Sequence, residues 1–376
     1  MKMPWPFAKK HDYSPLFMAA ILGFCLLPSG AIFADQQAPW NPFSASLSLD
    51  PAVFQQEWRG DLDGMIKRGY IRMLVVPTRT TYFVDKGVER GTAVDFARLY
   101  EDELNARIGA QHLMMKNLRV RVVFIPMKGD QILPALAEGK GDIAAANITV
   151  TPERLRNVDF AAAGRTGVSE IAVTGPASPN IASVEDLSGK EVFVRKVTSY
   201  YQSLLKLNAR FADEGKAPVV LKEAPEALAD EDLLEMLNAG LVPTVIVDRH
   251  IADFWKQIFP KIVVHPDVAV RTGGSIAWAI RKGTPQLKAE LDDFFERNKV
   301  GTKNGNLILN RYLKNVRYVK DAASETERKK FEILAKHFQT YGMQYDVDWV
   351  LMSAQGYQES KLNPNAKSRV GAIGIM

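Results

Sequence analysis

A glutamate near the end of the chain has the surroundings that proton transfer requires. Residues 357–376 read YQESKLNPNAKSRVGAIGIM, and Glu359 follows Leu351 and Gln355 at four-residue steps. This spacing predicts a helix on which Glu359 lies near the edge of the apolar stripe and close to the helix end. Such a position removes water from the carboxyl group and raises its pKa, as a general acid requires. A glutamate at a helix end is otherwise an ordinary solvated residue, so the residues that follow it decide between these interpretations.

Those residues closely resemble the signature of soluble lytic transglycosylases, ESxxNPxAxSxxGAxGlMQ. The matching positions are Glu359, Ser360, Asn363, Pro364, Ala366, Ser368, Gly371, Ala372, Gly374 and Met376. The resemblance implies that Glu359 protonates the glycosidic oxygen between N-acetylmuramic acid and N-acetylglucosamine. The substrate's acetamido group, oriented by Ser368, then assists, and a 1,6-anhydro ring closes. For Ser368 a turn-capping hydroxyl is the alternative. The mechanism implied here uses no metal and no cofactor.

The family signature continues with Gln and with most of a lysozyme-like domain, whereas this sequence ends at Met376. Residues 323–376 are therefore expected to be the N-terminal part of an incomplete lytic transglycosylase domain. We expect this chain alone to be inactive and the full-length protein to be a lyase that acts on the glycan strands of peptidoglycan.

A second group of residues surrounds Arg154. The stretch from Val122 to Phe160 reads VVFIPMKGDQILPALAEGKGDIAAANITVTPERLRNVDF, with the pieces PAL, GK, D, TVTPER and VDF in that order. These pieces resemble the motifs of family-3 bacterial solute-binding proteins, and the resemblance covers about residues 70–300. It implies a type II, periplasmic-binding-protein-like module, in which two α/β lobes are joined by a hinge and ligand binds in the cleft.

The resemblance also implies roles for individual residues. Arg154 would hold the α-carboxylate of a ligand, for which a planar, permanently charged fork is well suited. Thr149 belongs to the same motif, and Asp248, at the end of an apolar strand, would meet an α-amino group. Tyr82 and Phe83 lie where aromatic residues of the cleft often occur. The alternatives are a surface ion pair for Arg154, a strand-end cap for Asp248, and core packing for the two aromatic residues.

Two departures from the family pattern put binding of a free amino acid in doubt. Where the family usually has FSxPY, this chain has Phe160 followed by AAAG, which removes a hydroxyl group and an aromatic ring. Pro243 replaces an Asp that is common before the second hinge strand. A muropeptide, a short peptide, an amino acid or no ligand at all remain open for the cleft.

Hydrophobic periodicity predicts how these residues are positioned. Strands alternate with helices from Ile71 to Phe295, which indicates parallel sheets. The expected strands are 71–76, 120–125, 143–148, 170–174, 192–196, 219–221, 244–247 and 276–280. The expected helices are 97–108 with Gly109 as a stop, 131–138, 200–211, 228–237 and 286–295. After Arg297 the pattern becomes helical, with a connecting helix at 307–313 and a capping box at Ser324 ahead of a helix that Gly342 ends.

The N-terminus has the order of a secretory signal. Lys9 and Lys10 precede an apolar run, 16–27, that is shorter than the roughly 20 residues of a bilayer span, and small residues follow up to Ala34. We expect cleavage after Ala34, with an uncleaved anchor or a lipidated Cys25 as alternatives. The expected organisation is then a signal peptide at 1–34, a lead-in at 35–67, the solute-binding-like domain at 68–300, a linker at 301–322 and the catalytic part at 323–376.

Composition narrows the possible partners. The net charge is +5 and the only cysteine lies inside the expected signal peptide. A weak positive excess does not call for nucleic acid, and the cleaved protein would have no disulfides. No HExxH, GxSxG, CxxC or P-loop pattern occurs, so no metal or cofactor site is expected.

Together, the two resemblances indicate the membrane-bound lytic murein transglycosylase F family, whose members fuse a solute-binding-like module to the catalytic domain. The expected place is the periplasm, peripheral at the inner face of the outer membrane, with possible peripheral membrane association. The alternative is a periplasmic solute-binding or sensor protein without catalytic activity.

Overall fold

The computed structural model describes most of the region between residues 56 and 345. The described ranges are 56–85, 88–111, 119–176, 178, 180–316, 319, 337–338 and 340–345. Glu359, Ser368 and the expected signal peptide lie outside these residues. Residues 340–345 are helical, so this helix continues past Gly342, which was expected to end it.

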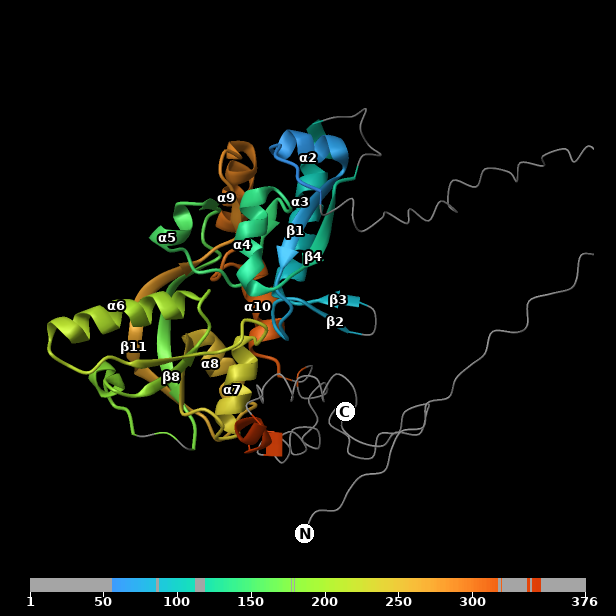
Figure 1. Ribbon diagram of the computed structural model, residues 1–376. Helices are drawn as coiled ribbons and strands as arrows, with labels where there is room; N and C mark the ends of the chain where they lie inside the picture. The colour runs from blue at the N-terminus through green and yellow to red at the C-terminus, as the bar shows by residue number, and fades with distance from the viewer. Residues whose placement is uncertain are drawn as a thin grey trace, which may run out of the picture. The chain divides into compact units, whose positions relative to one another are not determined.

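The first lobe is built on a five-stranded sheet with the order β4-β1-β5-β12-β6 (Figure 1). Its strands are β1 (Tyr70–Val75), β4 (Arg121–Pro126), β5 (Ile143–Ala144), β6 (Val158–Phe160) and β12 (Ala279–Arg281). β1 pairs in parallel with β4 and β5, whereas β12 runs antiparallel between β5 and β6. The final strand of the lobe therefore returns from the distant end of the sequence and is inserted into the middle of the sheet.

Helices cover both faces of this sheet. They are α2 (Leu62–Arg68), α3 (Thr92–Gln111), α4 (Gly129–Glu138), α5 (Pro152–Leu155), α9 (Pro285–Asn298) and α10 (Lys303–Leu313). Alternate residues of β1 point to opposite faces, as a strand requires. Ile71 and Met73 join the core beneath α2, α3, α9 and α10, and Leu74 joins the core beneath α4. A short hairpin, β2 (Phe83–Asp85) and β3 (Val88–Arg90), lies beside α3.

The second lobe has its own five-stranded sheet, with the order β11-β7-β10-β8-β9. Its strands are β7 (Arg165–Thr174), β8 (Glu191–Val194), β9 (Val220–Glu223), β10 (Thr244–Asp248) and β11 (Val263–Ile276). Its helices are η2 (Val184–Leu187), α6 (Ser199–Asp213), α7 (Asp230–Asn238) and α8 (Arg249–Lys256). β8, β9 and β10 are parallel, and β7 runs antiparallel to both β10 and β11.

The lobes are joined by β7 and β11, whose outer ends pair at Arg165 and Ile276. Ile276 also forms a bridge with Thr149 of the first lobe. A further crossing is made by the end of α10, since Tyr312 belongs to the first-lobe core while Leu313 and Val316 pack against the second-lobe core. The arrangement confirms the expected two-lobed α/β module.

Further expected element ends are wrong, and the strand expected at 276–280 is divided between the end of β11 and β12. α3 continues through Gly109 to Gln111, because the buried face that ends with Ile108 outweighs the roughly 1 kcal/mol that a glycine costs inside a helix. The strand expected at 143–148 is only Ile143–Ala144. It ends early because Asn147 has a left-handed backbone, with φ of 50°, which a strand does not accommodate.

The first-lobe core also includes segments expected to be lead-in and linker. In α2, Met65 is fully buried, and in α10 Ile308 and Tyr312 are buried. Asp61 caps two helices at once: its carboxylate accepts from the N–H of Leu62 in α2 and from that of Leu287 in α9, at 2.8 and 3.0 Å. This capping ties the start of the module to a helix more than 200 residues later in the chain.

A fully buried carboxylate, that of Asp142, ties the first lobe together. One carboxylate oxygen accepts from the backbone N–H of Arg72 at 2.7 Å, and the other from its Nη2 at 3.0 Å. Arg281 of β12 donates to it at 3.1 Å, and Arg68 at the end of α2 forms an ion pair with it. Arg72 also donates to the carbonyl oxygen of Gly139 at 2.8 Å. Three elements and the turn before β5 thus depend on one negative charge.

Replacing this carboxylate should therefore destabilise the fold strongly. We predict that Asp142→Asn lowers the free energy of unfolding by about 3–5 kcal/mol, because buried guanidinium groups lose their counter-charge. Urea unfolding followed by circular dichroism would measure the change. The control is Asp159→Asn, which removes a half-exposed ion pair with Lys282 at 3.5 Å and should cost less than about 1 kcal/mol. Equal losses in the two variants would contradict the role given to Asp142.

Candidate ligand-binding site

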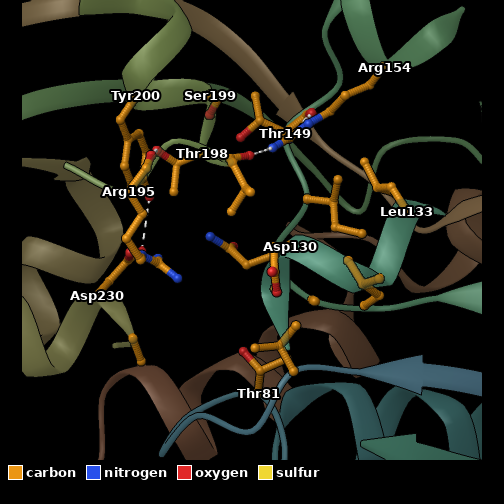
Figure 2. A pocket seen from close by; sticks show the side chains of 18 of the residues that line it. Thr81, Asp130, Leu133, Thr149, Arg154, Arg195, Thr198, Ser199, Tyr200 and Asp230 are labelled. Atoms are coloured by element: carbon orange, nitrogen blue, oxygen red, sulfur yellow. Dashed lines mark hydrogen bonds and ion pairs between the residues drawn. The ribbon is translucent and has the colours of Figure 1, made fainter. Parts of the chain in front are cut away.

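A cavity of about 640 Å³ lies between the two lobes (Figure 2). Its first-lobe lining comes from the loop after β1, from α4 and from the segment 146–158. Its second-lobe lining comes from the loop after β8, the start of α6 and the start of α7. This volume is within the range of sites for small molecules. The polar residues of the lining are Thr78, Thr80, Thr81, Asp130, Asn147, Thr149, Glu153, Arg154, Asn157, Arg195, Thr198, Ser199, Tyr200, Gln202, Asp230 and Glu231.

Arg154 and Thr149 both line one side of this cavity, as expected. Thr151 caps the short helix α5 and accepts from the N–H of Arg154 at 3.3 Å. The guanidinium of Arg154 donates to the carbonyl oxygen of Thr149 at 2.6 Å and to that of Val197 at 2.9 Å. Val197 belongs to the second lobe, so this side chain joins the two lobes as well as lining the cleft. Burial lowers the pKa of Arg154.

The N-terminus of α6 lies beside Arg154 (Figure 2). Thr198 caps this helix and accepts from the N–H of Tyr201 at 3.4 Å, and both Thr198 and Ser199 line the cavity. The first N–H groups of a helix have no acceptor within it and carry a partial positive charge. A guanidinium and a helix N-terminus therefore adjoin each other on two different lobes, an arrangement suited to a carboxylate.

The opposite side of the cavity contains a second guanidinium, that of Arg195, which directly follows β8. It forms an ion pair with Asp230 at the start of α7, and the hydroxyl of Tyr200 donates to the other oxygen of Asp230 at 3.1 Å. Glu231 also lines this side and accepts from the N–H of Arg79 of the first lobe at 2.6 Å. Burial, together with the neighbouring carboxylate of Asp232, raises the pKa of Glu231.

Asp248 is fully buried at the end of β10, behind two residues that line the cavity. Its Oδ2 accepts from Nδ2 of Asn147 in the first lobe at 3.0 Å, and its backbone N–H donates to the hydroxyl of Tyr200 at 3.2 Å. Its Oδ1 is buried and has no hydrogen-bond partner among the described residues. Burial, and then the negative charge of Asp230, raises the pKa of Asp248 to about 7. Arg165 and Arg154 interact with this carboxylate through their charge, but burial outweighs their effect on its pKa.

Tyr82 and Phe83, which were expected to line the cleft, lie in the first lobe away from it. Tyr82 is buried against Phe124, with ring centroids 5.6 Å apart, and its hydroxyl donates to Glu89 at 3.1 Å. Phe83 meets the ring of Tyr312 edge-on at 6.2 Å. Core packing, the alternative given from the sequence, describes both. The hairpin that begins at Phe83 turns this segment toward α3 and α10.

The sequence did not single out Arg195, Tyr200, Asn147 or Asp130, all of which line the cavity. One available signal was position: Arg195 lies near the carboxyl end of the strand expected at 192–196, and ligands of α/β sheets bind at the carboxyl ends of strands. Asn147 had no such signal, because its left-handed backbone is set by the surrounding structure.

Comparison with known proteins agrees with this geometry. A model of the bacterial extracellular solute-binding proteins, family 3, matches residues 74–313. This match spans more than half of the chain, and the chain belongs to that family. Among curated proteins, it is similar to three that are named membrane-bound lytic murein transglycosylase F. They come from Pseudomonas putida (24% identical over 322 residues), Ectopseudomonas mendocina (26% over 324) and Desulfosudis oleivorans (26% over 325).

The alignments with these relatives cover 82–84% of this chain and 61–64% of each relative. The chain therefore spans less than two thirds of their length. Within the described part of the chain, no helix is long and apolar enough to cross a membrane.

Solved structures share the fold. An ancestral arginine-binding protein bound to arginine is 25% identical, with a TM-score of 0.52, and the match covers 65% of this chain and 98% of that protein. A putative L-cystine ABC transporter from Listeria monocytogenes has a TM-score of 0.54 at 17% identity, covering 65% of this chain and 95% of the other, which is a likeness of fold alone. The module is thus of the type II periplasmic-binding-protein kind.

Because the pKa of Asp248 is raised in the folded state, the stability of the protein should depend on pH. Between the ordinary value of 3.8 and about 7 the folded state binds a proton that the unfolded state has lost, so the stability of the wild type falls as pH rises. Asp248→Asn removes this dependence. Its stability relative to wild type should rise by roughly 2 kcal/mol between pH 5 and pH 8, measured by thermal unfolding. Asp253→Asn, at an exposed site on α8, is the control and should give the same difference at both pH values. A pH-independent difference for Asp248→Asn would refute the assignment.

Proposed function

We propose that the full-length protein is a peptidoglycan lytic transglycosylase whose solute-binding module captures a carboxylate-bearing ligand in the cleft between its lobes. The observation that carries the binding part is the adjoining position of Arg154, from the first lobe, and the N-terminus of α6, from the second, in the lining of one cavity. A ligand carboxylate placed there contacts both lobes, so its binding favours the closed arrangement.

The candidate ligands share a carboxylate and differ in size. A cavity of about 640 Å³ has room for more than a free amino acid, and the sequence lacks the hydroxyl and aromatic ring that usually follow Phe160 in the family. We therefore propose a short peptide or a peptide-bearing fragment of the cell wall. Asp248 is positioned to receive an ammonium group of such a ligand once Asn147 moves aside, which would give a donor to its unpaired Oδ1.

The catalytic part of the proposal rests on residues 357–376 and on the names of the relatives. Glu359 is proposed to protonate the glycosidic oxygen between N-acetylmuramic acid and N-acetylglucosamine. The acetamido group of the substrate, oriented by Ser368, then stabilises the sugar cation. Glu359, now a base, removes the proton of the C6 hydroxyl, whose oxygen closes the 1,6-anhydro ring. The proton that Glu359 gives to the leaving oxygen is replaced by the proton that it takes from the C6 hydroxyl, so no other reactant is needed.

We place the protein in the periplasm, peripheral at the outer membrane, in keeping with its N-terminal pattern and with relatives named membrane-bound. A second candidate function is a solute receptor without catalysis. It is favoured by the likeness of the module to an arginine-binding protein bound to arginine. The two candidates differ in whether peptidoglycan is cleaved.

Binding should depend on Arg154. Charged hydrogen bonds of a guanidinium to a carboxylate contribute about 1.5–3 kcal/mol, so Arg154→Ala should weaken binding by roughly 10- to 100-fold. Arg154→Lys should recover only part of this loss, because an ammonium group cannot reproduce the fork. Calorimetry with muropeptides and free amino acids would measure the affinities. Arg156→Ala, a neighbouring exposed arginine, is the control. Unchanged binding by Arg154→Ala would refute the role given to Arg154, and no binding by the wild type would make the module a spacer rather than a receptor.

Cleavage should depend on Glu359. Digestion of sacculi by the full-length protein should yield 1,6-anhydromuramoyl products, identified by mass spectrometry. Glu359→Gln keeps the size of the side chain and removes its proton, so the rate should fall by roughly 10²-fold or more. Glu327→Gln, outside the signature, is the control and should retain activity. Hydrated reducing ends would indicate a hydrolase instead, and full activity of Glu359→Gln would refute the catalytic role.

A further inference from the structure

Arg195 has donor groups that its own ion pair does not use. Its side chain is only 11% exposed, and its ion pair with Asp230 is made through Nη2. Its Nε is buried and has no hydrogen-bond partner among the described residues. A buried, unpaired donor of a charged group costs free energy. Other parts of the Arg195 side chain line the ligand cavity.

The N-terminus of α4, in the first lobe, lies next to this guanidinium. Gly129 begins the helix and lines the same cavity, and a Cβ atom added to Gly129 would lie 3.9 Å from Nη1 of Arg195. Lys128, which precedes it, provides no side-chain cap. The N–H of Gln131 donates to the carbonyl oxygen of Lys128 at 3.1 Å. The N–H groups of Gly129 and Asp130 have neither an intrahelical acceptor nor a capping side chain from Lys128, and they carry the positive end of the helix dipole. Two positive features from different lobes meet at this side of the cavity.

The neighbouring carboxylates do not satisfy these donors. Asp230 uses one oxygen for Arg195 and the other for the hydroxyl of Tyr200, so it orients the guanidinium rather than filling the space before it. Glu231 accepts from the backbone of Arg79. Asp130 is exposed in the first turn of α4. Asp230 holds the guanidinium of Arg195 in place. The carboxylate of a ligand could then accept from the donors of Arg195 that Asp230 does not use.

We propose that Arg195 and the N-terminus of α4 form a second anion subsite in the cleft, and that the ligand is a dicarboxylate of amino-acid to short-peptide size. This inference rests on the proposed function, in which Arg154 binds the first carboxylate. The second carboxylate accepts from Nη1 of Arg195 in one lobe and from the N–H of Gly129 in the other. Arg154 and Arg195 line different sides of the cavity (Figure 2), so the two subsites select a ligand whose anionic groups are separated.

Matched acid and amide probes test this subsite directly. Calorimetry on the whole protein compares glutamate with glutamine, and alanyl-glutamate with alanyl-glutamine, because each pair differs only in the second carboxylate. Wild type should bind the better acid about 10- to 100-fold more tightly than its amide. Arg195→Gln should lower the affinity for the acid to that for the amide and change the latter by less than about threefold. Arg195→Lys should recover part of the preference.

The helix contribution has its own variant pair. Gly129→Pro removes one N–H at the first helical position, where proline is tolerated, and Lys128 has the extended backbone (φ −71°, ψ 151°) that must precede proline. It should weaken binding of the acid selectively, by roughly threefold or more, whereas Gly129→Ala keeps the N–H and should not. If Arg195→Gln fails to fold, the double variant Arg195→Gln/Asp230→Asn removes both charges together and takes its place.

The outcomes separate this inference from the one on which it rests. Equal binding of acid and amide by wild type, or an unchanged acid preference in Arg195→Gln, overturns the second subsite while Arg154→Ala still weakens both probes. Binding of the amide in preference to the acid overturns it as well. If neither member of either pair binds wild type and muropeptides do not bind, the ligand-binding function fails and this subsite fails with it.

Discussion

The first lobe depends on the charge of one buried carboxylate. Asp142 is fully buried at the turn before β5, and it accepts from Arg72 of β1 and Arg281 of β12 while pairing with Arg68 of α2. Elements from three distant parts of the sequence are thereby fixed around the same atoms. The segment that follows β5 runs from Asn147 to Arg154 and forms the first-lobe wall of the cleft. The turn at Asp142 therefore contributes to the stability of the first lobe and to the position of the residues that line the cleft.

Periodicity predicted most strands and helices of the module, because buried faces repeat at intervals of two or 3.6 residues wherever packing is regular. It did not predict α8 or the bent β11, whose register shifts where it passes between the lobes. It also did not predict that α2 and α10 belong to the first-lobe core, since short segments rich in polar residues give weak signals. Such segments are placed by contacts with residues far away in the sequence, as the double cap of Asp61 illustrates.

The sequence predicted those residues of the candidate site that belong to a recognisable motif or that end a predicted strand. Arg154 and Thr149 line the cavity, and Asp248 is at the strand end where it was expected, although Asn147 and Tyr200 separate it from the cavity. Tyr82 and Phe83 were misplaced because an aromatic ring is as well suited to a core as to a cleft. Arg195 was missed because its role comes from the element facing it, α4, and no local pattern of residues reports a neighbour on another lobe.

The end of α10 has a consequence for the energetics of the cleft. Tyr312 packs in one lobe, whereas Leu313 and Val316 pack against the other, so rotation of the lobes apart must remove apolar surface from contact at roughly 25 cal/mol per Å². Apparent affinity for a ligand equals the intrinsic affinity scaled by the fraction of molecules that are competent to bind. A module shortened to end at residue 300 would have a different open fraction, and its dissociation constants would not be those of the intact chain.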